Sequence, residues 1–203
     1  DDAVLRQVGD ELLPTAQKVV LTTAGGEPLG AGFETILDCA RRHGVRIDVV
    51  TNGMLMDERR FLAMRPLLDH LNVSVDCAVP EIYERIRAGA SFERLVERLS
   101  MVAGIRRDGA DGMLFSLSGV VMASNLPHLA GLVRFAARFG VDGVILQALR
   151  HEVAATRDEE PARRFPAAAI ERHLDAAAAA ARATGIGLIV AQSGRRPVFA
   201  RPP

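Results

Sequence analysis

Residues 18–53 read KVVLTTAGGEPLGAGFETILDCARRHGVRIDVVTNG. The stretch opens with a β-branched run at Lys18–Thr23 and continues, after a glycine-rich turn, into an amphipathic pattern at Phe33–His43. Gly44 then precedes a second β-branched run at Arg46–Thr51. Glycine is the usual residue just past a helix C-terminus, and strands that alternate with helices indicate βα units. The stretch therefore predicts a strand, a helix and a second, parallel strand.

The same alternation continues along the rest of the chain. Further strands are predicted at Leu71–Asp76, Met113–Met122, Val144–Ala148 and Ile186–Ala191. Helices are predicted at Ala3–Gln17, Asp57–Leu68, Phe92–Arg107, Leu126–Phe139 and Ala167–Thr184. Because the strands are apolar along most of their length, we expect both of their faces to be covered in a parallel sheet with outer helices, which is an α/β fold. The pattern leaves open whether the sheet closes into a barrel.

Composition narrows the possible classes of protein. With 203 residues, of which 49% are apolar and 25% charged, the chain has the size and composition of one globular domain. Its 25 basic and 25 acidic residues balance, so we expect neither nucleic acid nor a membrane surface as a partner. Two cysteines are too few for a disulfide framework and favour the cytoplasm. No apolar run could span a bilayer, and no basic segment opens a signal peptide.

Ligands of parallel α/β folds bind at the carboxyl ends of the strands, so the residues just after each run are candidates. After the first run, Gly25 and Gly26 would let the backbone approach a ligand, Glu27 offers a carboxylate to an ammonium group, and Pro28 fixes the chain direction. The same residues also suit an ordinary turn. The Thr51–Gly53 segment (TNG) after the second predicted strand is a turn signal of little value alone.

Further polar residues follow the third predicted strand. Ser74 and Asp76 alternate with Val75, so both could face one pocket, although Asp76 could equally cap the next helix. Arg87 carries a fork-shaped donor suited to a carboxylate, and it could equally lie on a solvated helix face. Cys77 could donate a hydrogen atom or simply be a buried small side chain, and we favour the second interpretation.

Taken in order, these pieces resemble the core of a radical S-adenosylmethionine (SAM) enzyme, most closely the branch with a C-terminal SPASM extension. The pieces are GGEPL (25–29), TNG (51–53), SVD (74–76), YERIRAGASFERL (83–95), Asn125 and GVDGV (140–144). The resemblance covers roughly 12–149 and depends on order and spacing. It implies a partial (β/α) barrel of parallel strands with outer helices, a core at 1–192, and a linker or tail at 193–203 toward a possible further module.

The resemblance also implies a SAM site. The amino group would lie against Gly25, Gly26, Glu27 and Pro28, the carboxylate against Ser74 and Arg87, the rest of the pocket beside Thr51 and Asp76, and the adenine beside Leu146 and Gln147. Asn125 matches a family position too. It directly precedes Leu126-Pro127 and a predicted helix, however, so we favour a role as the helix N-cap.

The family's defining feature is a three-cysteine loop, CxxxCxxC, whose thiolates hold a 4Fe-4S cluster. This sequence has no such loop, because Cys39 falls in a predicted helix and Cys77 at a strand end. No metal ligand is therefore assigned, and the histidines lack metal-type spacing. Since GGEP normally follows the family's second strand, we expect the first strand and its cluster loop to lie outside this sequence.

The complete protein is therefore expected to use SAM and the cluster to make a 5′-deoxyadenosyl radical that abstracts a hydrogen atom from a substrate. A peptide or protein is the leading substrate, a reductant protein is the implied partner, and the 203 residues alone should be inactive. The alternative is a cluster-less, non-catalytic domain that binds a peptide or protein partner. A Schiff-base barrel enzyme is disfavoured, because Lys18, the only lysine, stands at the start of a strand.

Overall fold

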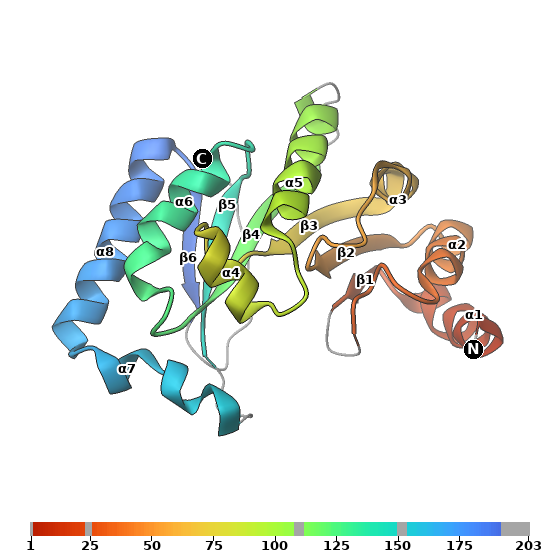
Figure 1. Cartoon of the computed structure of the whole chain (residues 1–203). Coiled ribbons are helices and arrows are strands. Elements are labelled where there is room, and N and C mark those ends of the chain that lie inside the picture. The colour runs from red at the N-terminus through yellow and green to blue at the C-terminus, as the bar shows by residue number, and fades with distance from the viewer. Residues whose placement is uncertain (1, 23–25, 108–111, 150–153, 192–203) are drawn as a thin grey trace. The chain divides into compact units, whose positions relative to one another are not determined.

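The computed structural model describes residues 2–22, 26–107, 112–149 and 154–191. These residues divide into two compact units. The first unit comprises the described parts of Asp1–Val73 and Arg94–Phe115, and the second those of Ser74–Glu93 and Ser116–Pro203. Figure 1 labels the helices and strands of both units. Each unit has its own parallel strands and its own helices.

The first unit contains three parallel strands that follow one another in chain order: β1 (Lys18–Leu21), β2 (Arg46–Thr51) and β3 (Leu68–Ser74, up to Val73). Its helices are α1 (Asp2–Leu12), α2 (Phe33–His43), α3 (Glu58–Met64) and α5 (Phe92–Arg107, from Arg94 on). Short 3₁₀ turns, Leu13–Thr15 and Arg65–Leu67, follow α1 and α3. The predicted succession of strand, helix and strand over 18–53 is confirmed.

The α2–β2 connection shows why the sequence folds in this way. Gly44 adopts a left-handed conformation (φ 65°), and its N–H bonds to the carbonyls of the last turn of α2. A glycine reaches this conformation without steric cost and so ends the helix cleanly. The chain then enters β2, where Ile47, Val49 and Thr51 are buried and alternate with half-buried residues. As a result, Thr51 is buried at the carboxyl end of β2.

Strands β1 and β6 (Gly187–Ala191) are not buried on both faces. Val19 packs against a small cluster that includes Leu13 and Cys39, whereas the side chain of Val20 is 45% exposed. Val190 in β6 is 48% exposed. Successive residues of a strand point to opposite faces, so the helices of each unit cover one face of these strands and leave the other accessible in the described chain.

The second unit contains β4 (Leu114–Val121, from Ser116 on), β5 (Gly143–Ala148) and β6, again parallel and in chain order. Its helices are α4 (Pro80–Ile86), α6 (Leu129–Ala137), α7 (Pro161–Arg164) and α8 (Ala167–Thr184). Helices α6 and α8 lie side by side over β5 and β6 (Figure 1). Short 3₁₀ segments, Leu126–His128 and Ala154–Glu159, precede α6 and α7.

A glycine in β4 determines how the segment after β3 meets this strand. A Cβ on Gly119 would lie 2.7 Å from the carbonyl oxygen of Val75 and 3.2 Å from the Cα of Asp76. The N–H of Val75 also donates to the carbonyl of Ser118 at 2.6 Å. Only a residue without a Cβ allows so close an approach of two backbones. Asp76 is therefore held against β4, near the carboxyl end of that strand.

The predicted elements agree with these bounds, with a few corrections. Strand β3 ends at Ser74 rather than at Asp76, and the predicted helix over Asp57–Leu68 is a shorter α3 followed by a 3₁₀ turn. The sequence analysis missed α4 and α7. The predicted tail, 193–203, lies outside the described residues. Within the part of the chain that the structure describes, no helix is long and apolar enough to cross a membrane.

Candidate functional site

In the first unit, the carboxylate of Glu27 lies at the carboxyl end of β2. Its Oε1 accepts a hydrogen bond from the hydroxyl of Thr51, and its Oε2 accepts one from the N–H of Asn52 at 2.9 Å. The hydroxyl oxygen of Thr51 in turn accepts from the N–H of Gly53 at 3.0 Å. These donors are neutral, so they orient the half-buried carboxylate without cancelling its charge. The structure thus brings together two predicted site residues, Glu27 and Thr51.

The neighbouring turn shows what the glycine at position 26 does. Gly26 has a φ of +118°, a backbone conformation that L side chains rarely adopt. A Cβ placed there would meet nothing within 4 Å, so the backbone conformation rather than crowding requires glycine. The turn closes where the N–H of Gly30 donates to the carbonyl of Glu27 at 3.0 Å. Pro28 lies within this turn and is half-buried, and Gly25 lies outside the described residues.

In the second unit, Asp76 and Arg87 form an ion pair. The carboxylate of Asp76 is buried, with Oδ2 2.7 Å from Nε of Arg87, while Oδ1 accepts a hydrogen bond from the N–H of Val120 at 2.8 Å. The Arg87 side chain is 26% exposed and follows directly after α4. Asp76 therefore does not cap α4, whose N-cap position is Val79, and Arg87 is ion-paired and only partly exposed.

Asn125 corrects a sequence prediction. It occupies the position before the 3₁₀ turn that precedes α6, but its side chain makes no capping hydrogen bond. Instead, its amide nitrogen donates to the carbonyls of Asp76 and Val120, each at 2.7 Å, and its amide oxygen accepts from the N–H of Met122 at 2.8 Å. The predicted N-cap role is wrong, because the buried amide is used to join the end of β4 to the backbone of Asp76.

The remaining residues predicted to contact SAM differ in their burial. Ser74 is half-buried at the end of β3, and Gln147 is exposed near the end of β5. Leu146 is completely buried in the core, so of the two residues assigned to the adenine only Gln147 presents an accessible side chain. The assignments of Ser74 and Gln147 remain predictions.

Both cysteines are free and buried, one in each unit. Cys39 lies within α2, where Arg42 contacts its sulfur at 3.2 Å, and Cys77 follows β3. Burial raises the pKa of the Cys77 thiol, and the thiol sulfur accepts from the N–H of Val79 at 3.5 Å. The prediction that Cys77 is a buried small side chain is confirmed. Among the described residues, no group of three or more His, Cys, Asp or Glu side chains could hold a metal ion.

Tyr83 is a neighbour of the ion pair that the sequence analysis did not single out. It lies four residues before Arg87, one helical turn away, and its ring packs edge-on against Phe92 with the centroids 5.6 Å apart. Burial raises the pKa of Tyr83, and the charge of Arg87 opposes this rise. The spacing of four residues was the available signal, because residues i and i+4 share one face of a helix.

Comparison with known proteins identifies the class. The family model of the radical SAM superfamily matches residues 2–115, which is more than half of the chain, and the chain belongs to this superfamily. No curated protein matches the sequence. The predicted relationship to radical SAM enzymes is therefore confirmed at the level of the superfamily.

Several solved structures share the fold. SuiB from Streptococcus suis bound to S-adenosylmethionine is 15% identical with a TM-score of 0.67, over 95% of this chain and 42% of SuiB. The enzyme anSMEcpe with bound AdoMet and the Kp18Cys peptide is 16% identical with a TM-score of 0.67, over 94% of this chain and 55% of anSMEcpe. A domain of a pyruvate-formate lyase-activating enzyme from Bacteroides vulgatus is 12% identical with a TM-score of 0.59, over 84% and 97%. These matches confirm the predicted α/β fold, and the chain spans less than half the length of SuiB.

Proposed function

We propose that this chain is the SAM-binding core of a radical SAM enzyme of the SPASM-type branch, and that the complete enzyme modifies a peptide or protein. Bound SAM and a reduced 4Fe-4S cluster would supply a 5′-deoxyadenosyl radical that abstracts a hydrogen atom. The structure of SuiB bound to precursor peptide SuiA and that of anSMEcpe with the Kp18Cys peptide support the substrate class. A reductant protein and a location in the cytoplasm belong to the same proposal.

The arrangement around Glu27 is the observation that carries this proposal. A carboxylate fixed by Thr51 and the N–H of Asn52 is preorganised, so binding an ammonium group costs little side-chain entropy. Because its hydrogen-bond donors are neutral, the carboxylate keeps its attraction for a cation. Glu27 is therefore assigned to the amino group of SAM, with the Gly26 turn beside it.

Arg87 is assigned to the carboxylate of SAM. Its contact with Asp76 uses Nε, and the guanidinium carries two further nitrogens on its other edges. The ion pair with Asp76 keeps the guanidinium beside this carboxylate, and its two terminal nitrogens could make the bidentate contact that a SAM carboxylate takes. Asp76 is thus a positioning residue for Arg87 in this proposal, and Ser74, Thr51 and Gln147 keep their predicted contacts with SAM.

The cluster does not fit the thiols of this chain. Its attachment in this family takes three cysteines in one loop, whereas Cys39 and Cys77 are both buried and belong to different units. We infer that residues outside this sequence hold the cluster. No step of the reaction is assigned to either thiol, and the 203 residues alone should neither take up a cluster nor cleave SAM.

Titration of the 203-residue chain with SAM, followed by calorimetry, tests the pocket without a cluster. Glu27→Gln should weaken binding by about tenfold or more, because the variant exchanges a charged acceptor for a neutral one. Glu34→Gln is the matched control, since this glutamate is exposed and pairs with Arg59 at 2.9 Å. It should leave SAM affinity unchanged. Gly26→Val is a poorer test, because a φ of +118° would strain valine whatever the ligand does.

Two outcomes would contradict the proposal. If the unaltered chain binds no SAM at SAM concentrations up to about 1 mM, this chain does not form the pocket. Equal affinities of the Glu27→Gln and Glu34→Gln variants would remove Glu27 from the site. In either case, the family membership and the fold would stand.

The second candidate function is a non-catalytic domain that has lost the cluster and binds a peptide or protein partner. The observation that favours it is that this sequence has two cysteines, both buried, and no three-cysteine loop. The protein expressed from the complete reading frame, reconstituted with iron and sulfide without oxygen, distinguishes the two functions. Release of 5′-deoxyadenosine from SAM under a strong reductant supports the enzyme. A colourless protein that releases none supports the non-catalytic domain.

A further inference from the structure

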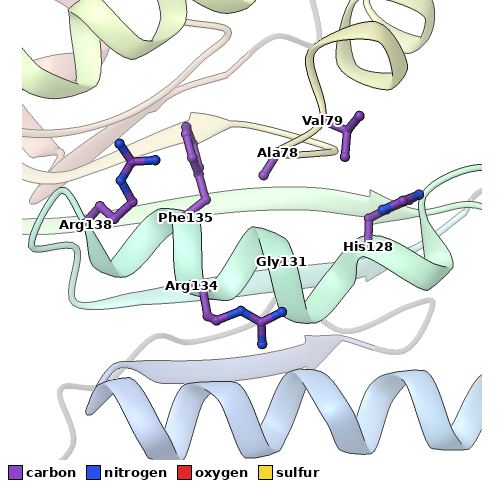
Figure 2. Close-up of a pocket in the computed structure, with 7 residues that line it drawn as sticks. All are labelled: Ala78, Val79, His128, Gly131, Arg134, Phe135 and Arg138. Carbon is purple, nitrogen blue, oxygen red and sulfur yellow. The ribbon is translucent and has the colours of Figure 1, made fainter.

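A hollow of about 330 Å³ opens on the second unit between α6 and the segment that leads into α4. Ala78 and Val79 line it from that segment, and both are half-buried. Figure 2 shows them facing α6, and the remaining lining residues come from α6 and from the two residues that flank it, His128 and Arg138. None of the residues described above as SAM contacts lines this hollow.

The floor of the hollow is apolar and packed against neighbouring aromatic rings. Phe135 is 6% exposed, and its ring packs against Phe92 and Phe139, with centroid distances of 5.5 Å and 5.0 Å. Gly131 lies one helical turn away on α6, in the interior of the helix, where glycine is less favourable than alanine. A Cβ on Gly131 would meet nothing within 4 Å, so packing within the chain does not require glycine there. The missing side chain leaves the hollow open.

The rim of the hollow is basic. His128, just before α6, lies at one end of the hollow and Arg138, just after α6, at the other (Figure 2), with Arg134 between them in the sequence. The guanidinium of Arg138 lies 5.9 Å from the ring centroids of both Phe135 and Phe139. No carboxylate among the described residues forms an ion pair with any of these basic side chains. The charges of Arg134 and Arg138 therefore remain available to an external partner, and the His128 ring remains available for a hydrogen bond.

We propose that this hollow docks an acidic peptide segment. An apolar side chain of the segment enters over Phe135 and Gly131, and carboxylates on either side of it pair with the basic rim. His128 and Arg138 are ten residues apart along the helical segment, which corresponds to about 15 Å at the usual rise. An extended peptide of about five residues spans this length, whereas a small anion reaches only one end. The balanced charge of the whole chain argues against a nucleic acid.

Fluorescence anisotropy of the 203-residue chain with a labelled ten-residue peptide of alternating leucine and glutamate tests the docking. Saturable binding is the expected result. The same peptide with lysine in place of glutamate should bind at least about tenfold more weakly, because the rim then repels it. Serine in place of leucine should have a similar effect, because nothing then fills the apolar floor.

Two variants locate the binding on the molecule. Gly131→Leu adds a side chain at the hollow, with no neighbour within 4 Å of its Cβ, and improves helix propensity. It should weaken peptide binding at least about tenfold while the melting temperature stays level or rises. Arg138→Glu should weaken peptide binding to a similar extent, because the substitution reverses the charge at one end of the rim. Arg172→Glu reverses an exposed arginine on α8 outside the hollow and should change the affinity by less than about twofold.

Each remaining result overturns the proposal. Unchanged affinity in Gly131→Leu places the peptide elsewhere, and displacement by inorganic phosphate alone indicates a simple anion site. Self-association of the unaltered chain that Gly131→Leu abolishes, measured by sedimentation, identifies the occupant as a second copy. None of these assays contains SAM or a cluster, so their outcome is independent of the proposed enzymatic function.

Discussion

Two acidic side chains near the carboxyl ends of strands, Glu27 in the first unit and Asp76 in the second, are held in opposite ways. Glu27 is half-buried and accepts hydrogen bonds from the Thr51 hydroxyl and a backbone N–H. Asp76 is 3% exposed and pairs with the cationic Arg87 while accepting the N–H of Val120. The sequence analysis assigned both to one SAM pocket. The structure gives them different kinds of partner.

The difference indicates which of the two carboxylates is available to bind a cationic ligand. A buried carboxylate with a cationic partner has its charge compensated inside the protein, so it contributes to folding and to orientation. A half-buried carboxylate with neutral donors keeps its charge for a ligand. Substitution of Asp76 should therefore change mainly stability, and substitution of Glu27 mainly binding.

The largest expected effect is that of Asp76→Ala. Removing one partner of a buried ion pair leaves the other uncompensated, which costs about 2 to 4 kcal/mol here because Arg87 remains partly exposed. Urea unfolding followed by circular dichroism measures the free energy. Glu27→Ala is the matched control and should cost less than about 1 kcal/mol. Similar losses in the two variants would erase the contrast between the two carboxylates.

Asn125→Ser should have the next largest effect. Asparagine makes three hydrogen bonds here, and serine cannot reach all three partners, so the free energy of unfolding should fall by about 2 kcal/mol. Serine and asparagine are equally good N-caps, so a capping role would make the substitution nearly neutral. Urea unfolding distinguishes the hydrogen-bonding role from the capping role. A change in the free energy of unfolding below about 0.5 kcal/mol would support the capping role.

The smallest expected effect concerns Asp69, a half-buried aspartate outside both clusters, which gives the comparison a third carboxylate. Partial burial by itself raises the pKa of Asp69. The ion pairs with Arg46 at 2.6 Å and Lys18 at 3.0 Å lower this pKa by more than burial raises it, so the pKa lies below its ordinary value of 3.8. The ion pairs therefore stabilise the fold above that ordinary pKa, and this stability is lost as the pH falls through the lower, folded value.

Asp69→Asn should accordingly cost about 1 kcal/mol at pH 7, because the pairs are about one-third exposed, and almost nothing near pH 2. Urea unfolding at both pH values checks the difference, with Asp38→Asn as an exposed control. An equal loss at the two pH values would show that the effect is not electrostatic.

Much of the fold could be predicted because its signals are local. The bounds of α2, β2, α5 and α8 agree with the predicted bounds, since each has a clear period and most are closed by a glycine or a turn. Helix α4 was missed because its seven residues give too short a period to recognise. The exposure of Val20 and Val190 was missed because an apolar run does not reveal how many of its faces are covered.

The sequence by itself determined the alternation of strands and helices, the membership of the radical SAM superfamily and the identity of Glu27 as a candidate. Only the tertiary structure decided that Asp76 binds Val120, 44 residues later, and that Asn125 reaches back 49 residues to the same aspartate. A buried polar group must find a partner, and several partners in the sequence were chemically equivalent. The close approach at Gly119 decided which of them lies within reach.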